Sequence, residues 1–217
     1  FLVGCLSCQA HKCIHDHVKD KISNAPKFST KPDLYTHLDF VQGSNRRNLN
    51  SVPWNPLRIK VVSRLDSSTL SAGNKTFLTD KLLPDAVDYW KRTLSIRRPQ
   101  KLLVEGNCTH VWSNNKRCAT VSTENYCSHI RIDNTYVARH AYYVKSTDTN
   151  PSYKPATEPA GTTEGDYILY VTADATQHCG GQTLAYAATC RRDSNDRPVM
   201  GYANFCPEHV HDAANKY

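Results

Sequence analysis

The chain has 217 residues and a mass of 24.4 kDa, enough for one folded domain with appendages but too short for two large independent cores. Hydrophobic residues make up 39% and charged residues 22%, which excludes a collagen-like, low-complexity or wholly disordered protein. The mean hydropathy is −0.58 and no apolar run reaches the roughly 18 residues of a membrane helix, so we expect no transmembrane segment in this chain. The net charge of +7 would favour polyanions, but the densest cationic stretch, residues 91–101, lacks stacking aromatics and docking motifs. We therefore expect no nucleic-acid partner and interpret that stretch as a solvated helix end.

The first ten residues, FLVGCLSCQA, are apolar and then small, as at the end of a secretory signal peptide cleaved after Ala10. A buried first strand is the alternative, and it is less favoured because strongly polar sequence follows at once. We expect residues 1–10 to be a signal-peptide remnant. The protein is then predicted to enter the secretory pathway and to reach the extracellular space or the cell surface.

Cysteine usage agrees with a secreted protein. Of 9 cysteines, Cys5 and Cys8 fall in the signal remnant and Cys13 stands alone near the front. The other six are Cys108, Cys118, Cys127, Cys179, Cys190 and Cys206. An even number in this context predicts three disulfides, whose pairing the sequence does not decide. A structural zinc cluster is the rival, but no C-x-x-C pair follows the signal remnant.

The chain changes character at Leu57. Residues 11–56 are polar, with short apolar clusters, and look like a loosely packed leader, although Arg46-Arg47 offers an alternative processing boundary. Alternation over residues 57–65 predicts a half-buried strand. Apolar residues at spacings of three and four then predict an amphipathic helix over 77–97. Pro84 lacks a backbone donor, so we expect the helix to start near it or to kink there.

The second half of the chain reads as strands and loops. We expect a strand at 101–104, a cysteine-rich insertion through residue 127, and a long exposed loop over 145–165. Three further strands are predicted at 167–172, 184–189 and 199–205. Two sequons, at Asn74 and Asn107, are candidate glycosylation sites. A strand, a helix and then several strands give an α+β fold, with a folded domain over 57–217.

Several ordered segments resemble a known family. They are Leu82-Leu83-Pro84, Asp166 to Val171, His178 to Cys190, Asp196 to Val199, and Gly201 to Pro207. Over residues 13–207 the chain resembles the leishmanolysin family of zinc metalloendopeptidases, especially its invadolysin-like animal members. The resemblance implies a zincin-like amino-terminal subdomain, in which a disulfide-stabilised, twisted mixed sheet is backed by a long helix. It also implies a propeptide over residues 11–56, zinc as the cofactor, and peptides or proteins as substrates.

The zinc motif of this class does not occur in the chain. Its chemistry needs two His one turn apart on a helix and an adjacent Glu that activates water, the H-E-x-x-H pattern. We therefore assign no catalytic residue here, expect the zinc helix to follow residue 217, and predict that this chain alone is inactive. His209 and His211 are two apart rather than four and are expected to be solvent-exposed, and His178 is expected to be a surface or structural residue.

Two site assignments follow from the resemblance. Cys13, in His11-Lys12-Cys13-Ile14-His15, resembles the family's cysteine switch, in which a thiolate occupies the open zinc position until the propeptide is removed. The alternative is that Cys13 pairs with a cysteine outside this chain.

The second assignment is the stretch from Gly181 to Ala187, which looks like the sheet-edge strand beside the zinc. There an extended peptide could pair with Leu184, Ala185, Tyr186 and Ala187. An interior strand is the alternative.

We expect the chain to be the amino-terminal portion of a secreted or membrane-anchored leishmanolysin-like zinc endopeptidase. The alternative is a noncatalytic, truncated secreted protein that acts as a binding module or decoy. A third class, a basic adhesion protein that binds acidic glycans, depends only on the net charge. In the first case the rest of the catalytic domain should pack on the sheet and helix, whose apolar face is otherwise uncovered.

Overall fold

A mixed four-stranded sheet forms the centre of the molecule. The computed structural model describes residues 53–66, 68–97, 101–193 and 196–211. The sheet has the order β11-β12-β10-β2, with strands β11 (Ala185–Arg192), β12 (Pro198–Phe205), β10 (Tyr167–Thr172) and β2 (Ile59–Ser63). β2, β10 and β12 are parallel, and β11 is antiparallel to β12. These strands confirm the predicted ones, apart from shifts of one to three residues at most ends.

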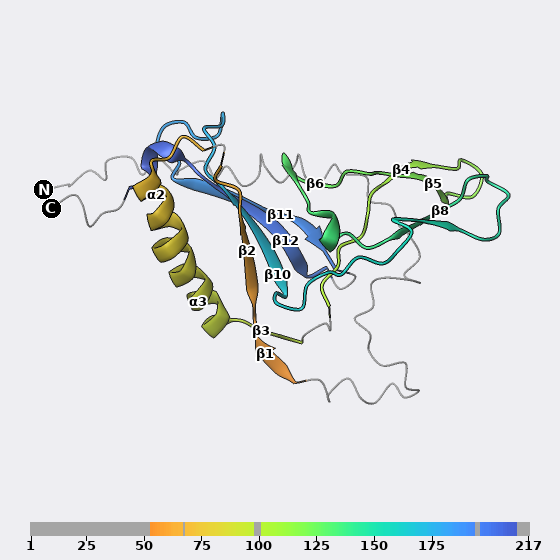
Figure 1. Ribbon diagram of the computed structural model, residues 1–217, viewed down its shortest axis with the longest axis horizontal. Helices are drawn as coiled ribbons and strands as arrows, with labels where there is room; N and C mark the ends of the chain where they lie inside the picture. The colour runs from red at the N-terminus through yellow and green to blue at the C-terminus, as the bar shows by residue number, and fades with distance from the viewer. Residues whose placement is uncertain (1–52, 67, 98–100, 194–195, 212–217) are drawn as a thin grey trace, which may run out of the picture.

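One long helix lies beside the sheet (Figure 1). It consists of α2 (Ala72–Phe77), a π-helical turn η1 (Leu78–Leu82) and α3 (Leu83–Thr93). The Ser71 side chain caps its start by accepting a hydrogen bond from the Asn74 N–H at 3.2 Å. The expectation that the helix starts near Pro84 is therefore wrong. The expected irregularity is present instead as the wide turn immediately before α3, where the Leu83 N–H bonds to the Leu78 carbonyl.

The helix also ends earlier than expected, at Thr93. Residues Ser95–Arg97 form strand β3, which pairs antiparallel with β1 (Trp54–Pro56). β1 lies just upstream of Leu57, and the leader boundary itself stays a prediction. Residues 1–52, including the signal remnant and Cys13, lie outside the described residues.

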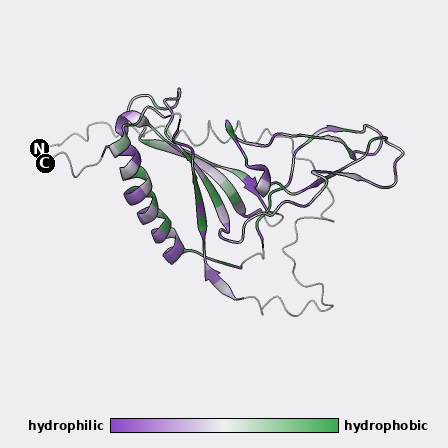
Figure 2. Ribbon diagram, viewed as in Figure 1, coloured by the Kyte–Doolittle hydropathy of each residue, from purple (hydrophilic) through white to green (hydrophobic). Residues whose placement is uncertain are grey.

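The two faces of the sheet are covered differently. The helix covers one face, where the core consists of Leu65, Leu70, Leu78, Leu83, Val171, Ala173 and Val210. The other face packs on the segment between the helix and β10, through Leu102, Ile132, Tyr136, Ile168, Tyr170, Met200 and Tyr202. Figure 2 shows the hydrophobic colour concentrated along the sheet strands, and hydrophilic colour recurring along the helix. Such a layered arrangement is an α+β fold, as predicted.

Short strands build an extension on the side of the sheet opposite the helix (Figure 1). They pair as β4 (Cys108–Val111) with β5 (Cys118–Val121), β6 (Tyr126–Cys127) with β7 (Ile130–Arg131), and β8 (His140–Tyr142) with β9 (Ser152–Lys154). Two 3-10 turns, η2 (Asn134–Tyr136) and η3 (Pro207–His209), complete the elements.

Two loop expectations need correction. Residues 101–104 form no strand, because only Leu102 and Val104 make isolated bridges, to Thr162 and Val137. The stretch 145–165 is not a continuous exposed loop, since it contains β9 and the buried Thr162. The first error arises because Leu102 and Val104 pair one residue at a time with distant segments, which local alternation does not reveal. In the second case β9 pairs with the nearby strand β8 as a short antiparallel pair.

An ion pair joins the starts of β2 and β10. Asp166 is completely buried and accepts hydrogen bonds from Arg58 through the backbone N–H (3.0 Å), Nε (3.0 Å) and Nη2 (2.8 Å). The Arg58 Nη1 also donates to the Thr163 carbonyl at 2.7 Å. The side-chain hydrogen bonds to Asp166, together with its negative charge, raise the pKa of Arg58 above its usual value. The pair fixes the register of the two strands where the preceding loop enters the sheet.

All six predicted disulfide cysteines are paired. Cys108–Cys118 joins β4 to β5, Cys127–Cys190 joins β6 to β11, and Cys179–Cys206 joins the segment before β11 to the end of β12. The latter two bridges hold opposite ends of β11 to the rest of the molecule. None of the helices in the described part of the chain has the length and hydrophobicity needed to cross a bilayer.

Candidate functional site

The four residues predicted to bind a peptide lie in strand β11 or directly before it. It stands last in the strand order and, among the described residues, pairs only with β12. The structure therefore places the stretch at an edge rather than in the interior of the sheet.

The hydrogen-bond direction along β11 can be worked out from its first contact with β12. The Cys206 N–H donates to the Leu184 carbonyl at 2.9 Å, and the register places these two residues opposite one another. In an antiparallel pair, hydrogen-bonded and non-hydrogen-bonded positions alternate. Tyr186 thus turns its backbone groups toward β12, as Leu184 does. The N–H and C=O groups of Ala185 and Ala187 are directed to the outer edge.

Side chains alternate along the same strand. Tyr186 and Ala188 are buried on the face that carries the disulfide-rich segment, whereas Ala185 and Ala187 are exposed. Leu184, just before the strand, is 66% exposed. The outer edge is therefore lined by backbone groups and two methyl side chains, which leave room for a second backbone to approach.

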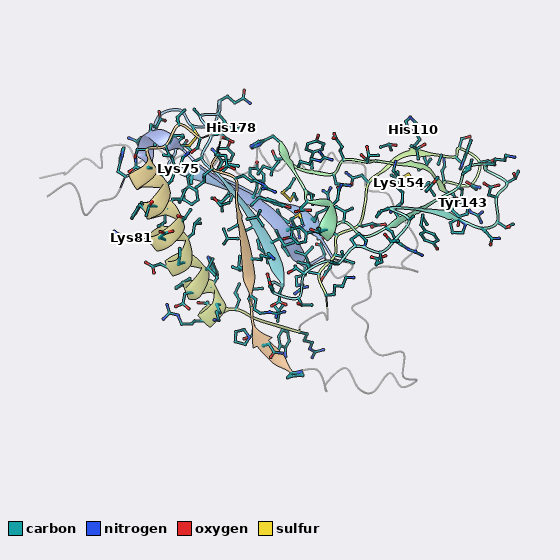
Figure 3. The ribbon with its side chains drawn as sticks, viewed as in Figure 1. Lys75, Lys81, His110, Tyr143, Lys154 and His178 are labelled. Atoms are coloured by element: carbon teal, nitrogen blue, oxygen red, sulfur yellow. A yellow bond between two sulfur atoms is a disulfide. The ribbon has the colours of Figure 1, made fainter. Side chains whose placement is uncertain are left out.

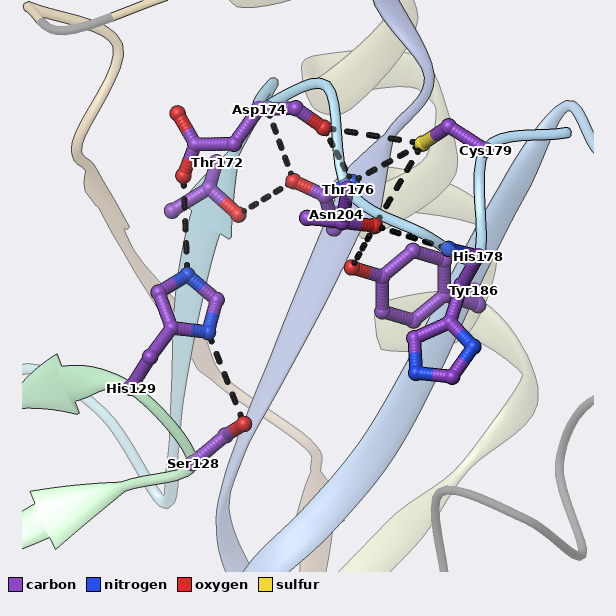
Figure 4. A network of polar contacts seen from close by, with 9 residues as sticks. All are labelled: Ser128, His129, Thr172, Asp174, Thr176, His178, Cys179, Tyr186 and Asn204. Atoms are coloured by element: carbon purple, nitrogen blue, oxygen red, sulfur yellow. Dashed lines mark hydrogen bonds and ion pairs between the residues drawn. The ribbon is translucent and has the colours of Figure 1, made fainter.

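A buried polar network holds the beginning of this edge (Figure 4). Asn204 is fully buried, and its Oδ1 accepts from the Thr172 hydroxyl (2.8 Å) and the Asp174 N–H (2.9 Å). Its Nδ2 donates to the Asp174 carbonyl (3.0 Å) and contacts Cys179 Sγ (3.5 Å). The amide thereby ties the end of β10 to β12 and to the Cys179–Cys206 bridge.

Tyr186 is fixed by neighbours on the same side. Its hydroxyl shares a hydrogen bond of 2.8 Å with Thr176 Oγ1, and its ring stands edge-on to the His178 ring, with centroids 5.4 Å apart. Burial raises the pKa of Tyr186, and the Thr176 hydrogen bond lowers it in part. His178 is half-buried and labelled in Figure 3 near the end of the sheet, consistent with the structural role expected for it.

A second polar group lies beside a shallow depression of about 350 Å³ at the carboxyl ends of β2 and β10. His129 Nε2 is 3.5 Å from Asp174 Oδ2, and His129 Nδ1 is 3.5 Å from Ser128 Oγ (Figure 4). Serine, histidine and aspartate recur in hydrolases, but there the nucleophile and base usually approach to about 2.6–3.2 Å. The His129 side chain is also 48% exposed. We interpret this group as a surface polar contact.

The remaining histidines near the site do not form a metal centre. His209 is half-buried, with its Nε2 3.2 Å from the Gly181 carbonyl, so the expectation that it is solvent-exposed is wrong; His211 is exposed. Across residues 53–66, 68–97, 101–193 and 196–211, no group of three or more His, Cys, Asp or Glu could hold a metal ion. The described residues therefore do not fit a zinc site, and no step of a reaction is derived through zinc.

The two sequons occupy different settings. Asn107 is exposed just before β4, and its Oδ1 accepts a hydrogen bond from Arg191 at 3.3 Å. Asn74 lies in α2 and is half-buried. Both remain predicted glycosylation sites.

Sequence reasoning missed the supporting residues of the edge, Asn204 and Thr176. The signal available for Asn204 was a lone amide within an otherwise apolar strand, which calls for buried hydrogen-bond partners. For Thr176 the sequence offered no signal.

Comparison with known proteins gives this geometry a context. A family model described as Leishmanolysin matches residues 150–217. Proteins named leishmanolysin-like peptidase are 28% identical over 94% of this chain in Drosophila pseudoobscura pseudoobscura and 30% identical over 72% in Caenorhabditis briggsae. A ciliated left-right organizer metallopeptidase of Xenopus laevis is 27% identical over 96% of the chain.

The matched region is a limited part of each relative. It covers 32%, 25% and 29% of the three proteins, so the chain spans about a third or less of the length of the curated relatives it matches. Within that span the similarity includes β10, β11 and β12, which form the candidate site. The chain belongs to the leishmanolysin family of metallopeptidases.

Proposed function

We propose that the chain is the amino-terminal part of a secreted or membrane-anchored zinc endopeptidase, in which β11 binds the peptide substrate. The observation that carries this proposal is the outward direction of the Ala185 and Ala187 backbone groups at the sheet edge. An extended peptide can add to such an edge as a new strand, with main-chain hydrogen bonds that do not depend on substrate sequence. The two small side chains leave that approach open.

The zinc ligands and the catalytic base would come from residues beyond those described, since no suitable group lies among them. Zinc in this class activates water for peptide hydrolysis. Within this chain, the proposed zinc-directed residue is Cys13, which would hold the enzyme inactive until the leader is removed. In a protein as long as the relatives, called the family-length protein below, Cys13→Ser should raise the peptidase activity before the leader is cleaved. After cleavage it should leave the activity unchanged.

The edge-strand role can be tested with one pair of variants of the family-length protein. Ala187→Pro removes an outward N–H while keeping the Tyr186 bonds to β12, and proline is tolerated on edge strands. Ala187→Ser is the matched control, because it keeps that N–H.

We expect Ala187→Pro to lower kcat/KM for an extended fluorogenic peptide by about tenfold, the loss of roughly one substrate hydrogen bond. Ala187→Ser should stay near the wild-type value. Equal activity of the proline and serine variants would contradict substrate pairing at β11. Peptide binding without any hydrolysis by the family-length protein would instead favour the binding-module alternative.

Secretion can be tested separately. Asn107 is exposed, so a chain that passes through the secretory pathway should carry an N-glycan there. Secretion from a eukaryotic host should yield a protein whose electrophoretic mobility increases after glycosidase treatment, and Asn107→Gln should remove much of that change. Asn74→Gln measures the share of the second sequon. A chain retained in the cytosol without glycan would contradict the proposed localisation.

A further inference from the structure

A cavity of about 300 Å³ lies within the extension. The residues that line it come from β5, β7, η2, β9 and neighbouring loops, and none of them belongs to β11. Its apolar lining consists of Gly106, Val121, Val137, Ala138 and Pro155. Ligand pockets start at about this volume and combine an apolar lining with a few polar groups. The polar groups of this cavity therefore decide what it can bind.

One of these polar groups, the side-chain amide of Asn125, is buried. Asn125 is 3% exposed, and its Oδ1 accepts a hydrogen bond from the Asn107 N–H at 3.0 Å. Because a backbone N–H needs an acceptor, this contact identifies the amide oxygen, and the other atom is the nitrogen with its two donors. Nδ2 forms no hydrogen bond with the described residues. Buried donors are normally satisfied, and since Asn125 lines the cavity, an acceptor placed there can supply the missing bond.

Two cationic side chains line the same cavity. Arg131 Nη1 is 3.6 Å from Glu124 Oε1, too long for a hydrogen bond, and the Arg131 side chain is 56% exposed. Lys154, which Figure 3 labels on the extension, is exposed, and its side chain forms no ion pair or hydrogen bond with the described residues. No aspartate or glutamate occurs among the described residues that line the cavity. The charge at the cavity therefore favours an anion.

We propose that this cavity binds a small organic carboxylate. The planar pair of carboxylate oxygens would accept from Asn125 Nδ2 and pair with Arg131 and Lys154. The apolar part of the ligand would lie against Val121 and Val137, which are both buried. The carboxylate can belong to a free acid or to the last residue of a peptide, since both present the same group. Binding requires no catalysis, so it does not depend on the proposed function.

Two other occupants fit these groups less well. Ordered water would satisfy Asn125 Nδ2, but it would leave the apolar lining hydrated and the charges of Arg131 and Lys154 unbalanced. Inorganic phosphate would balance these charges, but it has no apolar part to bury. A ligand with an anionic and an apolar part uses every feature of the cavity.

Titration of the full 217-residue chain with benzoate and with N-acetylleucine, followed in amide NMR spectra, tests the site. Benzoate is a free acid, whereas N-acetylleucine imitates the last residue of a peptide. We expect a saturable shift of the amide signals of residues 121–125 and 137–138, with a Kd of about 1 mM for ligands of this size. Benzamide and N-acetylleucinamide are the matched uncharged ligands and should bind about tenfold more weakly. The acid that binds more tightly identifies the source of the carboxylate.

Three variants locate the binding. Lys154→Met removes one exposed cation and should raise the Kd for the acid about fivefold. Asn125→Asp keeps the acceptor for the Asn107 N–H but replaces the free donor by an oxygen, and should raise the Kd about tenfold. Lys145→Met is the matched control, because Lys145 is exposed on the same extension outside the cavity lining, and it should leave the Kd unchanged. Thermal unfolding checks that Asn125→Asp is folded, and Lys154→Met tests the site without altering a buried residue.

Four results would overturn the proposal. The first is equal binding of the acids and their amides, and the second is an equal loss of affinity in Lys154→Met and Lys145→Met. The third is full displacement of the acid by an equal concentration of inorganic phosphate, which would show an anion site without an apolar part. The fourth is the absence of any saturable shift at residues 121–125 and 137–138, which would leave water as the occupant.

Discussion

Replacing Asp166 by Asn should destabilise the fold strongly, because the carboxylate is completely buried and bonded three times to Arg58. Asparagine has nearly the same shape and volume as aspartate but carries no charge. Both Asp166 oxygens accept from Arg58, so the NH2 group of the asparagine would oppose an arginine donor. Breaking a buried ion pair costs about 3–5 kcal/mol. The Arg58 side chain is 31% exposed and keeps some hydration, so we expect a loss near the lower limit, about 3 kcal/mol.

Urea unfolding measures this loss. With a slope of about 3 kcal/mol/M for a chain of this size, the midpoint should fall by about 1 M at unchanged slope. A matched control lies nearby, where Lys60 Nζ in β2 contacts Glu164 Oε2, in the loop before β10, at 2.6 Å and the Glu164 side chain is 75% exposed. Glu164→Gln should leave the midpoint unchanged within error, since exposed ion pairs contribute little. Equal midpoints for Asp166→Asn and Glu164→Gln would refute the reasoning.

Two other changes probe the extension. Burial lowers the pKa of His140, and Glu105 opposes this shift only in part. As the pH falls, His140 is therefore protonated in the unfolded chain at a higher pH than in the folded protein. Stability should therefore fall as the pH drops below the unfolded-state pKa of about 6.5, and His140→Gln should flatten that fall in thermal unfolding at pH values down to about 5. Serine at both cysteines of Cys127–Cys190, 63 residues apart, should cost about 4 kcal/mol, against about 3 for Cys108–Cys118, 10 residues apart. The reverse order in urea unfolding would show that strain or denatured-state structure outweighs loop closure.

The strands of the sheet could be predicted because each is a short apolar run bounded by turn residues. Their directions could not. Three short strands in quick succession look like consecutive hairpins, yet β10 and β12 are parallel and β11 lies outside them, antiparallel. The sequence of β11 alternates side chains, but nothing in it shows which residues turn their backbone groups outward. That distinction depends on the contact between Leu184 and Cys206, which only the three-dimensional pairing reveals.

For the helix, the sequence predicted which segment packs on the sheet but not where the helix begins. Its apolar spacing correctly located the segment that packs on the sheet, but its first turns contain Gly73 and Asn74, which favour helix poorly. The cap at Ser71 was a usable signal for the true start. Asn204 could have been singled out as a lone amide in an apolar strand, but its hydrogen-bond partners could not, because they come from segments about 30 residues away.

The π-helical turn η1, just before α3, contains one residue more than an α-helical turn, and Pro84 accounts for that extra residue. In an α-helix the proline ring would crowd the carbonyl of Asp80, and the five-residue bond from Leu83 to Leu78 relieves that contact by adding a residue to the turn. Deleting one residue between Leu78 and Leu83 would restore a four-residue spacing and keep both leucines on the same face. Such a deletion should be poorly tolerated alone and well tolerated with Pro84→Ala. In an alignment of relatives, a gap at this turn should accompany the loss of the proline.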